Sequence, residues 1–221
     1  MKPEDARYAE VLSFPSGREL ARRLPLLVAG LFLLGAGIAV SLRAELGVAP
    51  WDVFHQGIAK HTPLSFGTAN LVVSAFVVAL AWRLGARIGV GTVVNALGVG
   101  TVIVLLTLAG PVKGLAHDPL GVRIALLVAG LTLMGIGSGL YLGAALGAGP
   151  RDSLMVVGAA RTRFRIGLVR ATIELAALLA GLALGGTAGI GTVAFVLLIG
   201  PSIESSFWLL ARSPLALPSN L

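Results

Sequence analysis

Residues 46–52 read LGVAPWD, and residues 146–152, one hundred positions later, read LGAGPRD. The same offset carries LLVAGL at residues 26–31 onto an identical LLVAGL at residues 126–131, and it superimposes several single glycines without a gap. One glycine that recurs at a fixed offset is common by chance, whereas this many matches in one ungapped register indicate a tandem duplication. The chain is therefore predicted to contain two copies of one unit.

The composition indicates a membrane protein. Of the 221 residues, 56% are hydrophobic and only 12% are charged, and the chain has 30 glycines and no cysteine. Soluble domains carry about 25% charged residues. Here the charges are confined to short patches between long apolar runs, which is typical of a multi-pass membrane protein. The net charge of +7 comes from cations that flank these runs, so nucleic-acid binding is not expected.

Six apolar runs of roughly 20 residues are each long enough to cross a bilayer. The expected fold is an all-α polytopic membrane protein of two three-span repeats, each with a short broken or re-entrant helix after its first span. The expected segments are a cytoplasmic N-terminal segment (1–23), repeat one (24–110, spans 24–42, 66–84 and 89–109), a linker (111–120), repeat two (121–210, spans 121–142, 166–184 and 190–210) and a cytoplasmic tail (211–221).

Three spans per repeat is an odd number, so the second copy enters the membrane from the opposite side and the repeats are predicted to be inverted. The cations support this topology, because cytoplasmic loops are enriched in Lys and Arg. With a cytoplasmic N-terminus, only four of the 17 cations are external: Arg43, Lys60, Lys113 and Arg123. The expected location is the bacterial plasma membrane, with both termini in the cytoplasm.

Each copy of the repeated motif combines helix-ending and helix-starting residues. The glycine is expected to end the preceding helix, the proline to start a short helix, and the aspartate to complement the dipole in its first turn. These residues are Gly47, Pro50 and Asp52 in the first copy and Gly147, Pro150 and Asp152 in the second. Two interpretations of segments 50–60 and 150–161 stay open. They are either re-entrant helices whose N-termini face a substrate, or amphipathic surface helices in which the aspartate only caps the helix.

Polar side chains inside the spans are the other candidates for a pathway, because carboxylates at membrane depth usually mark function or a buried pair. Asn95, Glu174 and Glu204 are such residues. Glu174 follows Arg170 by four positions, so a structural ion pair between them is the preferred interpretation. Glycines in the first span of each repeat, such as Gly30 and its counterpart Gly130, are expected to allow close helix packing, and a glycine-lined conduit is a secondary alternative.

No cofactor or metal site is expected. The three histidines, His55, His61 and His117, are assigned to loops and lack the spacing of metal ligands. No nucleophile, base and orienting group converge in the sequence, so no catalytic residue is assigned and the chain is not expected to be an enzyme.

The motif LGxxPxD after the first span, the glycine that opens the second span and the Gly-x-Gly-Thr that opens the third resemble the YczE/YyaS/YitT group of bacterial integral membrane proteins. The likeness covers residues 24–210. It implies a multi-pass plasma-membrane protein, and it supplies no catalytic or ligand residues.

Two functions follow from these patterns. The first is a small-solute transporter or channel, which inverted repeats, paired helix starts and an intramembrane carboxylate favour. The second is an accessory or regulatory membrane protein that acts through partner contacts. The expected partners are the lipid bilayer and a small solute, and whether the protein is a homo-oligomer stays open.

Overall fold

The computed structural model describes residues 17–108 and 118–212, which form helices and short connections without a strand. Within these ranges the helices are α2 (Gly17–Ala44), α3 (Pro50–His61), α4 (Phe66–Arg83), α5 (Val90–Leu108), α6 (Leu120–Gly143), α7 (Pro150–Thr162), α8 (Ile166–Ala183) and α9 (Ile190–Ala211).

Six of these helices, all except α3 and α7, are long and apolar enough to cross a membrane. The all-α polytopic fold is therefore confirmed. Helix α2 begins at Gly17, so it extends seven residues before the predicted span, which starts at residue 24. Residues 17–23 continue the helix although they carry several cations, and Arg23 lies 3.9 Å from Glu19 one turn earlier. Residues 1–16, most of the linker (109–117) and residues 213–221 lie outside the described part of the chain.

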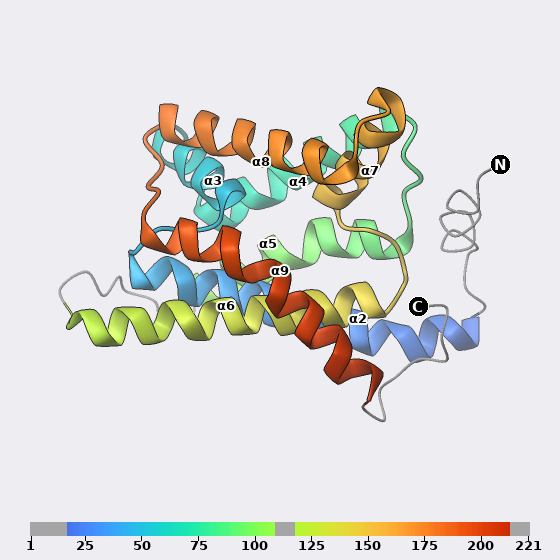
Figure 1. Cartoon of the computed structure of the whole chain (residues 1–221), viewed down its shortest axis with the longest axis horizontal. Helices are drawn as coiled ribbons and strands as arrows, with labels where there is room; N and C mark the ends of the chain where they lie inside the picture. Colours follow the sequence, from blue (N-terminus) through green and yellow to red (C-terminus); the bar gives the residue numbers. More distant parts are fainter. Residues whose placement is uncertain (1–16, 109–117, 213–221) are drawn as a thin grey trace.

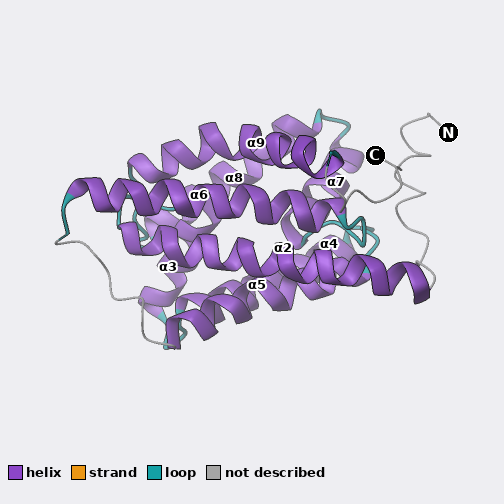
Figure 2. Cartoon of the chain, turned by 90° about the horizontal axis from the view of Figure 1, so that it is seen from below, coloured by secondary structure: helices purple, strands orange, loops and turns teal. Residues whose placement is uncertain are grey.

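The helices lie in two layers (Figures 1 and 2). One layer contains α2, α5, α6 and α9, with α2 and α6 packed against each other. The other contains α3, α4, α7 and α8, in which α3 lies along α8 and α7 along α4. α4 packs against α5 and joins the layers, whereas α8 and α9 make no comparable contact among the described residues. The second repeat is therefore more open than the first.

Glycines bring the backbones of α2 and α6 together. A Cβ atom on Gly137 would lie 2.6 Å from the carbonyl oxygen of Gly30, and one on Gly130 would lie 2.8 Å from that of Gly37. As residue numbers increase along α2, the numbers of their contact partners on α6 decrease, so the two helices are antiparallel. The glycines are used for close packing, as the sequence predicted, because any side chain here would meet backbone atoms.

The turns after α2 and α6 have the same backbone conformation. Glu45 and Ala145 are left-handed, with φ of 48° and 51°, and Gly47 and Gly147 follow with φ of 100° and 127°. The prediction that the glycine itself caps the helix was therefore wrong by two residues, because Glu45 and Ala145 take the left-handed position before Gly47 and Gly147. At the end of α2, the Arg123 side chain donates hydrogen bonds of 2.8 Å to the carbonyls of Ala44 and Glu45.

The two repeats exchange equivalent hydrogen bonds across these turns. The backbone N–H of Gly91 donates to the carbonyl of Leu146 at 2.8 Å, and that of Gly191 donates to the carbonyl of Leu46 at 2.7 Å. The first turn of the last helix in each repeat is thus held by the motif of the other repeat.

We expect Gly137→Ala to lower the stability of the protein, because the added methyl group would meet backbone atoms of α2 at 2.6 Å. Overpacking of this kind costs about 1–3 kcal/mol. Gly121→Ala on the same helix is the control, since nothing lies within 4 Å of its Cβ position. Thermal unfolding in detergent compares the two variants, and equal melting temperatures would contradict the packing argument.

Candidate functional site

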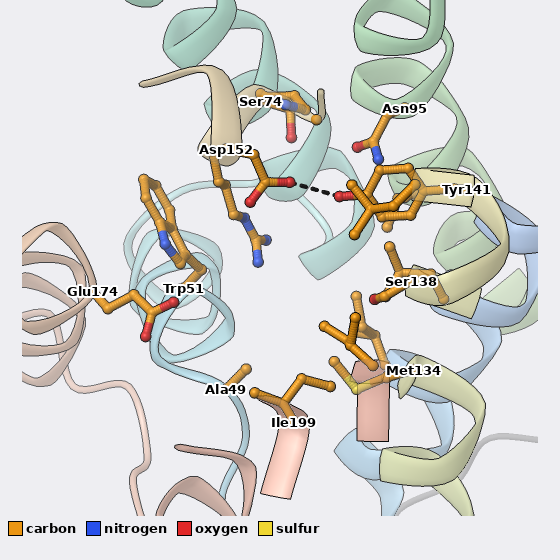
Figure 3. A pocket seen from close by; sticks show the side chains of 18 of the residues that line it. Ala49, Trp51, Ser74, Asn95, Met134, Ser138, Tyr141, Asp152, Glu174 and Ile199 are labelled. Carbon is orange, nitrogen blue, oxygen red and sulfur yellow. Dashed lines mark hydrogen bonds between the residues drawn. The ribbon is translucent and has the colours of Figure 1, made fainter. Parts of the chain in front are cut away.

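A cavity of about 200 Å³ lies between the two layers. Its wall is built from both repeats: α2, α4, α5, α6, α8 and α9 contribute side chains, together with the first residues of α3 and α7. Figure 3 shows the side chains that face one another across it. The cavity therefore lies where the two copies of the sequence motif meet.

The short helices α3 and α7 both begin at this cavity. Ala49 and Trp51 flank the first residue of α3 in the cavity wall, and Gly149 and Arg151 flank that of α7. Neither helix has a side-chain hydrogen bond at its N-cap, because alanine and glycine stand there. The positive ends of two helix dipoles are thus directed at one small space.

The aspartates of the motif are not caps. Both lie in the first turn of their helix, as predicted, but each carboxylate is engaged by side chains instead of the helix end. Asp52 is 1% exposed, with its Oδ1 atom 3.3 Å from Nδ1 of His55 and 3.8 Å from Nη2 of Arg151. Tyr141 donates a hydrogen bond of 2.6 Å from its hydroxyl to Oδ2 of Asp152 (Figure 3).

Behind Asp52 is a buried polar cluster that the sequence did not indicate. His55 is fully buried in α3, so its assignment to a loop was wrong, as was that of His61, the last residue of α3. Nδ1 of His55 also lies 3.3 Å from Nδ2 of Asn70 on α4. This nitrogen can donate to Asp52 or accept from Asn70, depending on the tautomer.

Arg151 connects the two repeats. Its guanidinium lies 5.2 Å from the centre of the Trp51 ring, within the range of a cation–π contact, and approaches Asp52 of the other repeat. Arg151 occupies the position in repeat two that Trp51 occupies in repeat one. The signal was therefore present in the sequence, as the one charged difference between LGVAPWD and LGAGPRD.

Arg170 and Glu174 pair as their spacing predicted, with Nε of Arg170 donating to Oε1 of Glu174 at 3.0 Å. Both line the cavity, and the two side chains are 46% and 20% exposed. This pair therefore contributes less to stability than a fully buried pair would, because solvent screens a pair of this exposure. Their counterparts in repeat one, Asn70 and Ser74, line the same cavity.

The remaining candidates divide into two groups. Asn95 and Pro150 line the cavity, and Asn95 lies beside Tyr141 in Figure 3. Pro50 is buried and does not line the cavity, although its chain neighbours Ala49 and Trp51 do. Glu204 is exposed on α9 and does not line the cavity either. No cluster of metal-binding side chains occurs among the described residues, and His117 is not among them.

Comparison with known proteins gives a family and two relatives. A model of a family of unknown function (DUF6198) matches residues 21–206. The chain is 35% identical over 196 residues to an uncharacterized protein of Haemophilus influenzae, with 87% of each chain covered. It is 33% identical over 187 residues to the uncharacterized membrane protein YczE of Bacillus subtilis, with 83% of this chain and 84% of that protein covered. No solved structure matches. The resemblance to the YczE group is thus confirmed.

We expect Arg151→Gln to destabilise the protein, because the buried carboxylate of Asp52 loses its cation. A stranded polar group of this kind costs about 1–3 kcal/mol. Adding Asp52→Asn removes the stranded charge, so the double variant should melt above Arg151→Gln.

Arg161→Gln is the control for this pair, since Arg161 lies on the same helix but donates from Nε to the carbonyl of Leu84 at 2.8 Å, in exposed surroundings. Melting curves in detergent are compared for all variants. A double variant no more stable than Arg151→Gln would show that Asp52 does not depend on this cation.

Proposed function

This chain is a membrane protein of the DUF6198 family. We propose that it carries a small solute across the bacterial plasma membrane by alternating access. In this mechanism the central cavity is the solute site. The α4–α5 and α8–α9 contacts are the two gates, and they close in turn.

One difference between the repeats carries this proposal. In repeat one, a Cβ atom on Gly67 would lie 2.6 Å from Cγ2 of Val104 and 3.0 Å from the carbonyl oxygen of Gly100, so α4 and α5 are in close contact. The equivalent glycines of repeat two are Gly167 and Gly200, at the same offset of one hundred residues. Nothing lies within 4 Å of either Cβ position. Repeat two therefore has the same glycines as the α4–α5 contact, but its helices α8 and α9 are separated at these positions.

Two copies of one unit that differ in this way support a mechanism in which they exchange conformations. Transporters with inverted repeats move one half or bundle against the other around a fixed central site. The second state would close α8 on α9 at Gly167 and Gly200 and separate α4 from α5. The solute site would then be reached from the opposite side of the membrane.

The sequence of α9 supports a hinge at the open gate. Pro201 follows Gly200 directly, whereas Thr101 follows Gly100 in α5. A proline inside a helix removes one backbone hydrogen bond and allows bending. After this point α9 stays packed on α6, since a Cβ atom on Gly135 would lie 2.5 Å from Cβ of Ser202. Bending at Pro201 can therefore close the gate while this contact is kept.

Glu204 acquires a role in the closed state. It occupies the position of Val104, the residue that touches Gly67 at the start of α4 in repeat one. The N-terminus of α4 is capped by Ser65, whose side chain accepts from the N–H of Thr68, but α8 has Arg165 at this position and no side-chain cap. Closing the α8–α9 gate would bring the Glu204 carboxylate to this uncapped helix end, where negative charge is favourable.

The short helices support the re-entrant interpretation over the surface one. α3 has six buried residues and packs along α8 and α4, and its last turn reaches the end of α8, where the Lys60 amine donates to the carbonyl of Gly185. A helix of 12 residues is about 18 Å long, roughly half the thickness of a bilayer. It therefore runs from the central cavity to one surface, and α7 is inferred to run to the other.

The antiparallel packing of α2 and α6 supports opposite orientations of the repeats, and the distribution of cations favours cytoplasmic termini. In that orientation the open α8–α9 gate faces the cytoplasm.

We expect Lys60→Cys to react with an impermeant thiol reagent in intact cells and Arg163→Cys to react only after permeabilisation. The chain has no other cysteine. Reaction of Arg163→Cys from outside would contradict the inverted topology.

The gate itself is tested by introducing Gly167→Cys together with Gly200→Cys. Neither residue meets an atom within 4 Å, so both substitutions fit this state. A disulfide needs Cβ atoms about 3.5–4.5 Å apart. We expect oxidation in membrane vesicles to join the two residues, measured as loss of free thiols, because the alternate state brings them into contact.

The control pair is Gly121→Cys with Gly200→Cys, since Gly121 also has open space around it but lies at the start of α6, on neither gate. This pair is expected to keep its free thiols. Free thiols in the Gly167–Gly200 pair after oxidation would show that α8 and α9 stay apart. That result would overturn alternating access and favour an accessory role.

A further inference from the structure

We propose that the solute is a small amphipathic zwitterion of the kind of an aliphatic α-amino acid, with its carboxylate on Arg151 and its ammonium group between Asp152 and Glu174. This inference rests on the proposed function, because it names the substrate class of the same cavity.

Arg151 is a cation with unused hydrogen-bonding capacity. Its Nη2 atom lies 3.8 Å from Asp52, which is beyond hydrogen-bond distance, and among the described residues its guanidinium has no hydrogen-bond acceptor. The other cation that lines the cavity differs, since Arg170 donates to Glu174. A guanidinium presents donors in a planar fork that matches a carboxylate. The side chain of Arg151 is 29% exposed and lines the cavity, so this fork is accessible to a solute.

The surroundings of Arg151 also favour a carboxylate. The N-termini of α3 and α7 end at the same wall, and half-helix N-termini are a common site for the anionic group of a transported solute. Trp51 forms part of this wall, and its indole N–H, in a side chain only 7% exposed, has no partner among the described residues. A buried N–H group normally has an acceptor. These observations together point to an anionic group beside Trp51 and Arg151.

A purely anionic solute does not fit the charge of the cavity. Two cations line it, Arg151 and Arg170, and so do two carboxylates, Asp152 and Glu174. Asp52 behind the wall adds a negative charge, and the two helix ends contribute about +0.5 each. The sum is close to zero, so a solute with net charge would be poorly balanced. Asp152 and Glu174 both line the cavity and supply the negative charge that an ammonium group requires.

The remaining wall combines polar side chains, such as Asn95 and Ser138, with an apolar part. Met134 and Ile199 lie on the side of the cavity away from Asp152 (Figure 3), and Leu34, Ile38 and Val99 complete this apolar part. Sites for drug-sized ligands usually have about 300–1,000 Å³, so a cavity of about 200 Å³ suits a smaller molecule. A short hydrocarbon side chain attached to a zwitterionic head group matches the volume of the cavity. It also matches the separation of the wall into a charged part and an apolar part.

The test uses the purified full-length protein in lipid nanodiscs and three probes that share one hydrocarbon chain. These are L-leucine, 4-methylpentanoate, which lacks the amine, and 3-methylbutylamine, which lacks the carboxylate. Binding is measured by calorimetry. We expect leucine to bind at least about tenfold more tightly than either analogue, because each analogue leaves a charged group of the wall unpaired.

Arg151→Lys is the matched variant, since it retains the charge but loses the planar fork. It should weaken leucine binding at least about tenfold, with little effect on 3-methylbutylamine. Arg161→Lys is the control, because Arg161 is outside the cavity, and it should bind leucine as the parent protein does.

Two results would overturn this assignment: 4-methylpentanoate that binds as tightly as leucine, or the absence of binding by leucine and by L-valine alike. Its failure is distinguishable from that of the transport mechanism. Disulfide formation between Gly167→Cys and Gly200→Cys without leucine binding would reject the substrate class alone. Leucine binding without that disulfide would reject the gate and leave the binding site in place.

Discussion

The close contact of α2 with α6 is the interaction on which the rest of the structure depends. Glycines remove the side chains that would separate the two backbones, and the contact replaces the hydrophobic drive that is weak between helices in lipid. Because each helix opens one repeat, the antiparallel crossing fixes how the two copies face each other. The turn that follows each helix then directs α3 or α7 toward the centre, so the cavity lies beside this contact.

Much of this arrangement could be predicted from the sequence, because duplication is visible as a fixed offset and apolar runs have a length set by the bilayer. The two helix starts at Pro50 and Pro150 are local features, since the proline and the residues around it determine them. The pairing of Arg170 with Glu174 was also local, one helical turn apart. What these predictions share is that no knowledge of distant contacts was needed.

The polar cluster and the open gate could not be predicted in this way. The sequence around His55 predicted a loop. The contact of His55 with Asn70 arises only because α3 packs against α4. Asp52 lies 3.8 Å from Arg151, which is distant in the chain and belongs to the other repeat. Gly167 and Gly200 look identical to Gly67 and Gly100 in sequence, yet their surroundings differ. Because the glycines are identical in the two repeats, the sequence cannot show which helix pair, α4–α5 or α8–α9, is in contact.

The exchanged hydrogen bonds between the repeats have a consequence for how the protein is made. The carbonyl of Leu46 accepts from Gly191, and the N–H of Gly91 donates to Leu146, so each half carries a backbone group whose partner belongs to the other half. Repeat one leaves the ribosome first, and until repeat two is synthesised these groups have no native partner. A second, antiparallel copy of a single repeat could supply the same partners, because the two hydrogen bonds are equivalent in the two repeats.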